Sequence, residues 1–153
     1  MSRLGRLSGL GFRALSALHG AILGATGWRV AARVGGMPVV ALRTVGHRSG
    51  RGRTVVLSAP VVDGDTVVLV ASRGGDDRHP AWYRNLVAHP DVELTIGGRT
   101  RRVRARVADA AERDALWPRV IAAYRGYGVY QRRTEREIPL VICEPRKGDA
   151  PSR

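Results

Sequence analysis

The sequence predicts a small antiparallel β-barrel of about six strands with short helices at its flanks. Short apolar segments rich in valine follow one another along the chain, and turns that contain glycine separate them, as in a strand meander. The 153 residues suffice for a single domain. Hydrophobic residues make up 44% of the chain and charged residues 25%, a composition that excludes a disordered chain and a bundle of membrane-spanning helices.

The first half of the chain contains three predicted strands, at residues 38–45, 53–62 and 66–72. The glycine-rich, basic segment 46–52 turns the chain between the first two strands. Residues 63–65, Asp-Gly-Asp, form a tight turn before the third. Two consecutive hairpins are therefore expected.

The second half begins with a short helix and continues with another hairpin. Proline is favoured at the start of a helix, where its missing N–H is not needed, so Pro80 predicts a helix that reaches about Ala88 and ends before Pro90. Residues 92–96 and 99–107 form the hairpin. In its second strand valine and alanine alternate with arginine, so one face of that strand is exposed to water.

A longer helix and one more strand complete the predicted domain. Asp109 predicts the start of a helix that reaches about Tyr124, because Glu112 follows three residues later and the pair can exchange side-chain and backbone hydrogen bonds. Residues 138–143 form the last strand.

The N-terminal residues 1–28 have the pattern of an amphipathic helix. One side carries Leu4, Leu7, Ala14, Leu15, Leu18, Ile22 and Ala25, and another carries Arg3, Arg6 and Arg13. Charges interrupt the apolar stretch, so no membrane-spanning helix is expected. Two roles remain open: packing on the domain, or peripheral contact with an anionic membrane. The expected organisation is an amphipathic helix and linker over residues 1–36, the barrel domain over 37–146 and a loose tail over 147–153.

The net charge of +13 suggests a polyanionic partner. However, Lys147 is the sole lysine among 26 basic residues, a bias typical of GC-rich coding as much as of a selected surface. A protein that binds nucleic acid would place aromatic residues among the basic residues of the strand 99–106, and this strand has none. Nucleic acid is therefore not an expected partner.

Several classes of chemistry find no support in the chain. Cys143 is the single cysteine, in an apolar run, so we expect a buried thiol and a reducing cytoplasm rather than a disulfide framework. Asp76, Asp77 and His79 are too close in sequence to converge on a metal ion, and no metal site is expected. No serine lies in a nucleophile-elbow sequence, which argues against hydrolysis.

Three segments are candidates for ligand binding. In GHRSGRGRT, residues 46–54, glycines allow backbone N–H groups to turn toward an anion, while Arg48, Arg51 and Arg53 offer forked donors suited to phosphate or carboxylate. The alternative is an ordinary solvated turn.

The second candidate is SRGGDDRHPAWYRNL, residues 72–86, between a strand and a helix. Ser72 and Arg73 lie at the strand end, where the following glycines let the backbone approach a ligand closely. Trp82 and Asn85 share one face of the helix, and Tyr83 points elsewhere. From the residues alone, the favoured explanation of Trp82 is that it lies on the core face of the helix together with Leu86.

The third candidate is the series Tyr124, Tyr127 and Tyr130. Each ring combines apolar surface with a donor hydroxyl, so the series suits a planar ligand. Core packing is the alternative, although it would bury three hydroxyls. Gly126 and Gly128 weaken the prediction of a regular helix in this segment.

Taken in order, the segments TVGHRSGRGR, VLVASRGGDDRHPAWYRNL, VELTIGGRTRRVRARV and YRGYGVYQRRTEREIPLVICEP closely resemble the deazaflavin-dependent nitroreductase family of actinobacteria. The resemblance covers about residues 38–145. It implies a six-stranded antiparallel split β-barrel and coenzyme F-420, an 8-hydroxy-5-deazaflavin with a phosphodiester and an oligoglutamate tail. It also implies hydride transfer from the reduced deazaflavin to a small-molecule acceptor, either a quinone or a nitro-aromatic compound.

The resemblance also assigns residues to a site. Those implied to bind the cofactor are His47, Arg48, Ser49, Arg53, Thr54, Val55, Val56, Leu57, Val70, Ala71, Ser72, Arg73, Ala81, Trp82, Tyr83 and Asn85. Tyr124, Tyr127 and Tyr130 match residues that shape the acceptor pocket. Ser72 and Tyr130 are the candidates for donating a hydrogen bond to the acceptor oxygen as charge develops there.

Two departures from the family pattern bear on the site. His47 stands where relatives often carry arginine, which makes one anion contact weaker or dependent on pH. Residues 58–60, Ser-Ala-Pro, replace a bulkier strand segment and leave the acceptor open.

Other functions and assemblies also stay open at this stage. An FMN-binding split-barrel reductase and a non-catalytic deazaflavin-binding protein are the alternative functions. The chain could be a monomer or a homodimer, in the cytoplasm or at the inner face of the cell membrane.

Overall fold

The computed structural model describes residues 33–146, so the predicted N-terminal amphipathic helix and the C-terminal tail lie outside the described residues. The strands are β1 (Arg33–Val34), β2 (Met37–Val45), β3 (Gly52–Ser58), β4 (Val61–Asp63), β5 (Thr66–Val70), β6 (Asp91–Ile96), β7 (Arg99–Val107) and β8 (Leu140–Pro145). The helices are the short 3-10 helix η1 (Arg73–Gly75), α2 (Ala81–Ala88), α3 (Ala110–Ala123) and α4 (Gly126–Arg132).

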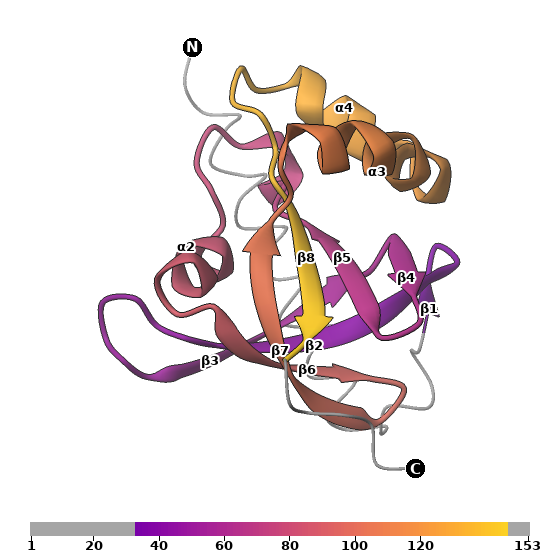
Figure 1. Ribbon diagram of the computed structural model, residues 1–153. Helices are drawn as coiled ribbons and strands as arrows, with labels where there is room; N and C mark the ends of the chain where they lie inside the picture. The colour runs from indigo at the N-terminus through magenta and orange to yellow at the C-terminus, as the bar shows by residue number, and fades with distance from the viewer. Residues whose placement is uncertain (1–32, 147–153) are drawn as a thin grey trace.

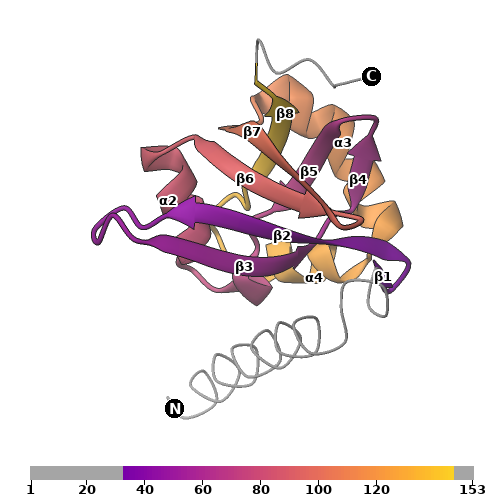
Figure 2. The same ribbon diagram turned by 90° about the horizontal axis from the view of Figure 1, so that it is seen from below.

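All strand pairs are antiparallel, and the sheet runs in the order β1-β2-β6-β7-β8-β5-β4, with β3 paired to β2. Figures 1 and 2 show α3 and α4 together on one side of the sheet and α2 apart from them, beside the β2–β3 hairpin. The mainly β, split-barrel-like fold expected from the sequence is therefore confirmed.

The expected count of six strands is wrong, because the segment predicted as one strand over residues 53–62 is two. β3 pairs with β2 and β4 pairs with β5, so the chain changes partners at Ala59 and Pro60. Pro60 has no N–H to donate to a strand ladder, whereas the N–H of Ala59 donates to the carbonyl of Pro38 at 2.8 Å. With the two-residue β1, the described residues contain eight strands.

Other boundaries differ by a few residues. The third predicted strand ends at Val70, and Ser72 instead precedes η1. The last strand, predicted over residues 138–143, begins at Leu140 and ends at Pro145. Pro80 is extended, with φ −64° and ψ 151°, and lies just before α2 rather than inside it. These differences move the ends of the predicted elements by one or two residues and leave their order unchanged.

The apolar side chains form two clusters, because successive residues of a strand point to opposite faces. On β5, Val67 and Leu69 join the cluster that α2 covers with Trp82 and Leu86. Val68 and Val70 join the second cluster, which α3 and α4 cover and which contains Val120, Tyr127, Ile138 and Leu140. We call these the α2 core and the α3–α4 core.

Cys143 belongs to the α2 core and is fully buried, as the sequence predicts. Burial raises the pKa of its thiol to about 12. The thiol is therefore protonated at neutral pH.

The predicted start of α3 is confirmed in detail. The Asp109 carboxylate accepts the N–H of Glu112 at 2.8 Å, and the Glu112 carboxylate accepts the N–H of Asp109 at 3.2 Å. Arg106 on β7 also donates to both Glu112 oxygens, at 2.7 Å each. The hydrogen bonds from Arg106 and then from the Asp109 backbone lower the pKa of Glu112 to about 2.

Replacing Glu112 by glutamine should lower the free energy of unfolding at pH 7 by about 0.5–1 kcal/mol, because it removes the charge of a largely exposed ion pair and keeps the cap acceptor. The folded-state pKa is depressed, so this stabilisation is present above pH 4.5 and is lost as the pH falls toward 2. Urea unfolding of both proteins from pH 7 to pH 2 should show the difference shrinking steadily below pH 4.5. A difference as large at pH 2 as at pH 7 would contradict this assignment.

Candidate functional site

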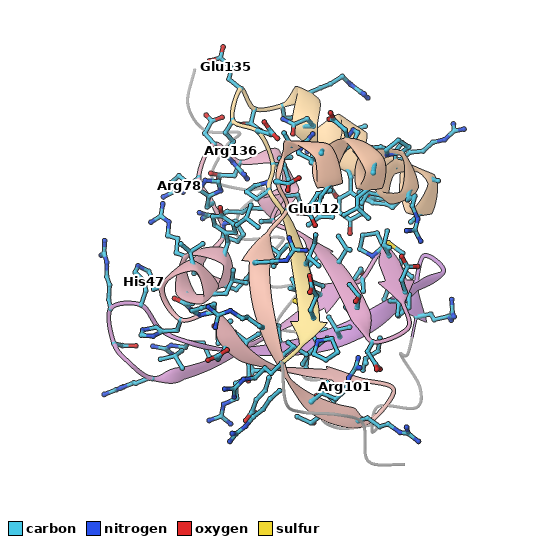
Figure 3. The ribbon with its side chains drawn as sticks, in the orientation of Figure 1. His47, Arg78, Arg101, Glu112, Glu135 and Arg136 are labelled. Carbon is cyan, nitrogen blue, oxygen red and sulfur yellow. The ribbon has the colours of Figure 1, made fainter. Side chains whose placement is uncertain are left out.

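The β2–β3 hairpin and α2 enclose a cavity of about 590 Å³. We call it the hairpin cavity. It is lined by Thr44, Gly46, His47, Arg48, Ser49, Arg53, Thr54, Val55, Arg73, Pro80, Ala81, Trp82 and Asn85. The hairpin turn projects beside α2, with His47 at the turn (Figures 1 and 3).

Hydrogen bonds within the turn fix its shape. The N–H of Gly46 donates to the carbonyl of Arg51 at 2.8 Å, and the N–H of Gly50 donates to the carbonyl of Gly46 at 2.9 Å. The Ser49 hydroxyl accepts the N–H of Arg51 at 3.2 Å. Gly50 has a φ of +69°, a conformation that favours glycine. The turn is thus a defined structure that presents Arg48 and Arg53 to the cavity.

Asn85 ties this turn to α2. Its side-chain oxygen accepts the backbone N–H of His47 at 3.0 Å and lies 2.8 Å from His47 Nδ1. Its amide nitrogen donates to the Thr44 hydroxyl at 3.0 Å. Because that oxygen can only accept, His47 carries a proton on Nδ1 and directs Nε2 elsewhere. Asn85 and Thr44 are both buried, so this network sets the distance between hairpin and helix.

The segment after β5 brings Arg73 to the cavity through an unusual backbone. Arg73, Gly74 and Gly75 have φ values of +45°, +64° and +85°, and Arg73 is the one non-glycine residue with positive φ in the described part of the chain. This conformation costs an arginine about 1–2 kcal/mol. Such strain is characteristic of functional sites, where the surrounding structure holds it in place.

Gly75 lies directly under α4. A Cβ atom at this position would be 2.6 Å from the carbonyl oxygen of Tyr130 and 2.9 Å from the Cβ of Arg133. Arg133 also donates to the carbonyl of Gly74 at 3.3 Å. The 3-10 segment and α4 are therefore packed backbone to backbone.

The three tyrosines form a cluster next to this contact. Their rings lie 5.2–6.2 Å apart in edge-to-face arrangements, and the hydroxyls of Tyr124 and Tyr130 are 3.4 Å apart. Tyr127 is buried in the α3–α4 core, Tyr130 is half-buried and Tyr124 is exposed. Core packing explains Tyr127 and part of Tyr130, whose ring packs against the same core, while Tyr124 and the exposed part of Tyr130 present a polar and aromatic surface.

Burial raises the pKa of Tyr127 to about 12. The pKa of Tyr130 is also raised, first by its contact with the Tyr124 hydroxyl and then by burial. Both hydroxyls are therefore protonated at neutral pH and can donate hydrogen bonds.

Most of the predicted cofactor residues meet at the hairpin cavity, and the rest lie around it. Val56, Leu57, Val70, Ala71, Ser72 and Tyr83 do not line it. Val55 and Leu57 pack against the α2 core, and strand alternation turns Val56 to the opposite face. Trp82 is both a core residue and a cavity wall, so the two interpretations of it are compatible.

Sequence reasoning did not single out Thr44, Gly46 or Pro80 as lining residues. Thr44 had a signal, since it is a polar residue near the end of a mainly apolar strand and lies next to the glycine-rich turn. The segments 76–79 and 133–136, which were given no role, contact each other: the Thr134 hydroxyl donates to Asp77 at 2.8 Å. Within residues 33–146, no group of three or more His, Cys, Asp or Glu side chains could hold a metal ion.

The cavity suits a ligand that is planar at one end and anionic at the other. Three arginines, Arg48, Arg53 and Arg73, line it together with His47, and none of the described residues that line it carries a carboxylate. Val55, Pro80, Ala81 and Trp82 supply an apolar wall. A second cavity of about 460 Å³ differs, because Asp91 and Glu93 share it with arginines. The donor set of the hairpin cavity fits the phosphodiester, carboxylates and ring of a deazaflavin cofactor.

The fold is a split β-barrel, and the hairpin cavity has the chemistry to hold a planar, anionic ligand. The sequence profile of the F420H(2)-dependent quinone reductase family matches residues 17–145. The chain belongs to this family, which confirms the resemblance seen in the sequence. It is an oxidoreductase, and its cofactor is coenzyme F-420.

Individual relatives and solved structures are also similar to this chain. An F420H(2)-dependent quinone reductase of Mycobacterium tuberculosis is 39% identical over 133 residues, covering 84% of this chain and 89% of the relative. A solved structure of an F420-H2 dependent reductase, FDR-A, is 38% identical with a TM-score of 0.64, covering 70% of this chain and 94% of that one. Another, described as a domain-swapped dimer, has the same identity and TM-score and covers 70% of this chain and 80% of that one.

Proposed function

We propose that the protein reduces a quinone with F-420H2, with the cofactor in the hairpin cavity and the acceptor against the tyrosine cluster. The main support for this proposal is the hairpin cavity, which is lined by three arginines and an apolar wall and by no carboxylate. When bound, the reduced deazaflavin supplies a hydride and disfavours one-electron chemistry. The protein supplies anion contacts, orientation and a proton donor.

Each side of the cavity has its own task. Arg48 and Arg53 on the hairpin, with Arg73 opposite, hold the phosphodiester and tail carboxylates through forked hydrogen bonds. Trp82 and Val55 pack against the ring system. Asn85 keeps the hairpin and α2 at a fixed separation, so that both sides contact the ligand at once.

On the acceptor side, the Tyr130 hydroxyl donates a hydrogen bond to the quinone oxygen as negative charge develops on it. Its raised pKa keeps the proton in place at neutral pH, and Tyr124 orients the hydroxyl. Ser72 is the weaker candidate, because it is buried just before η1, whereas Tyr130 is half-buried. Nitro-aromatic compounds accept a hydride in the same position.

Two further proposals concern contact with a membrane and the oligomeric state. None of the helices in the described residues is long and apolar enough to cross a membrane. The arginine-bearing amphipathic pattern of residues 1–28 supports peripheral contact with an anionic membrane, which would bring the site to lipid quinones from the cytoplasmic side. A homodimer is the assembly to test, since one solved relative is described as a domain-swapped dimer.

The test is to mix the purified protein with F-420H2 and a panel of quinones and nitro compounds, and to follow reoxidation by absorbance. We expect quinone-dependent turnover, together with tight binding of the deazaflavin and weak binding of FMN. Tight FMN binding would favour the flavin reductase, and deazaflavin binding without turnover on any acceptor would favour a non-catalytic role.

A matched pair of arginines tests where the cofactor lies. Arg53→Gln should weaken deazaflavin binding about 10–100-fold, because it removes a charged donor from the cavity. Arg51→Gln makes the same charge change on the same hairpin at a residue outside the cavity lining, and should weaken binding less than about threefold. Fluorescence titration measures both, and equal losses would contradict the placement.

A further inference from the structure

We propose that Arg136, in the segment between α4 and β8, is a positioning residue that holds Arg73 in the hairpin cavity. Arg136 does not line that cavity. It acts on the backbone on both sides of Arg73. The identity of the ligand in this proposal rests on the proposed function, whereas the effect on the backbone does not.

The Arg136 side chain donates hydrogen bonds to three carbonyl groups. Two precede Arg73: the carbonyl of Ala71, 3.2 and 3.3 Å from the two terminal nitrogens, and that of Ser72 at 2.9 Å. One follows it, the carbonyl of Asp76, which lies 2.8 Å from Nε. A single planar guanidinium group thus fixes the chain before and after the left-handed turn.

The turn needs such support from outside. Arg73, Gly74 and Gly75 are all left-handed, and the two glycines have many other accessible conformations once released. Gly74 has open space where a side chain would be, and the long hydrogen bond from Arg133 to its carbonyl, at 3.3 Å, is a weak restraint. The bonds at Ala71, Ser72 and Asp76 therefore set the direction in which Arg73 leaves the backbone.

The surroundings of Arg136 also favour backbone binding over ion pairing. No carboxylate lies within ion-pair distance of it in the part of the chain that the structure describes. A terminal nitrogen lies 3.2 Å from His79 Nδ1, which must be unprotonated to accept from it. Figure 3 shows Arg136 beside the segment that leads to α2. Lysine can replace it only in part, because an ammonium group has no rigid fork to reach all three carbonyls at once.

The first measurement needs no cofactor. Hydrogen exchange of the cofactor-free protein should show at least about tenfold faster exchange of the amides of residues 75 and 76 in Arg136→Gln, while the amides of β6 and β7 stay protected. Arg136→Lys should give an intermediate rate. Arg132→Gln, at the exposed end of α4, is the matched control and should leave these rates unchanged.

The second measurement is a double-mutant cycle on deazaflavin affinity, read by fluorescence titration. Arg73→Gln and Arg136→Gln should each weaken binding about tenfold, and the double variant should weaken it little further, because Arg136 acts through Arg73. A hundredfold loss in the double variant would overturn the proposal. So would unchanged exchange at residues 75 and 76. If Arg136→Gln does not fold, the same criteria apply to Arg136→Lys.

The two measurements also separate the proposal from the proposed function. If the wild-type protein fails to bind deazaflavin, the proposed function fails, but faster exchange in Arg136→Gln would still support a role for Arg136 in holding the Arg73 turn. If deazaflavin binds and the two variants act independently, the proposed function stands and the positioning role is wrong.

Discussion

Replacing Gly75 by alanine is expected to lower the free energy of unfolding by about 2–4 kcal/mol. About 1–2 kcal/mol comes from the left-handed backbone, with φ +85°, and a similar amount from overpacking. The new Cβ would meet the carbonyl oxygen of Tyr130, a backbone atom that cannot rotate away. Urea unfolding followed by circular dichroism measures the loss. Turnover should fall as well, because α4 and the Arg73 turn must separate.

Gly74→Ala provides the matched control. Gly74 has a similar φ of +64°, but a Cβ there meets no atom within 4 Å. This variant should lose only the contribution of the left-handed backbone, about 1 kcal/mol. The difference between the two variants isolates the contact between the 3-10 segment and α4. Equal losses would show that this contact does not contribute to stability.

Replacements of Asn85 should separate stability from anion binding. Asn85→Ala leaves the buried Thr44 hydroxyl and the His47 donors without partners, and we expect it to cost about 1–3 kcal/mol of stability. Asn85→Asp keeps two acceptors for His47, and the Thr44 hydroxyl can turn to donate. Its stability should therefore stay within about 1 kcal/mol of the wild type.

Cofactor affinity should respond differently to these two changes. The aspartate adds a negative charge at the wall of a cavity that has no other lining carboxylate, so deazaflavin binding should fall at least about tenfold. Added salt should reduce that loss. Fluorescence titration at two salt concentrations, beside thermal unfolding, gives both quantities. An Asn85→Asp protein that binds as tightly as the wild type would place the anionic part of the ligand elsewhere.

The strands and turns could be predicted because their signals are local. Valine-rich runs, glycine turns and the Asp109–Glu112 cap each depend on neighbours within a few residues. The partner change at Ala59 and Pro60 could not be read with the same certainty, since the apolar pattern continues through it. Each half forms its own hairpin, β3 with β2 and β4 with β5, and the apolar pattern does not mark where the first hairpin ends and the second begins.

Some residues of the site could likewise be predicted from local sequence, and others could not. Arg48 and Arg53 were predictable because glycines and arginines gather in one short turn. Arg136 was not, because it is one of several arginines in an arginine-rich segment, and only the folded chain brings it to the carbonyls of Ala71 and Ser72. Trp82 looked ambiguous because a residue on the inner face of a helix can belong to a core and also line a cavity, and Trp82 does both.

The two separate hydrophobic cores have a consequence for how such enzymes diversify. The hairpin cavity is built on the α2 core, whereas the tyrosine cluster is built on the α3–α4 core. Substitutions that reshape the tyrosines can therefore accumulate during evolution without disturbing the packing that supports the cofactor side. With the cofactor and acceptor placed as proposed, the fold would let one half acquire new acceptors while the other half keeps the same cofactor, and the Arg73 turn would connect the two halves.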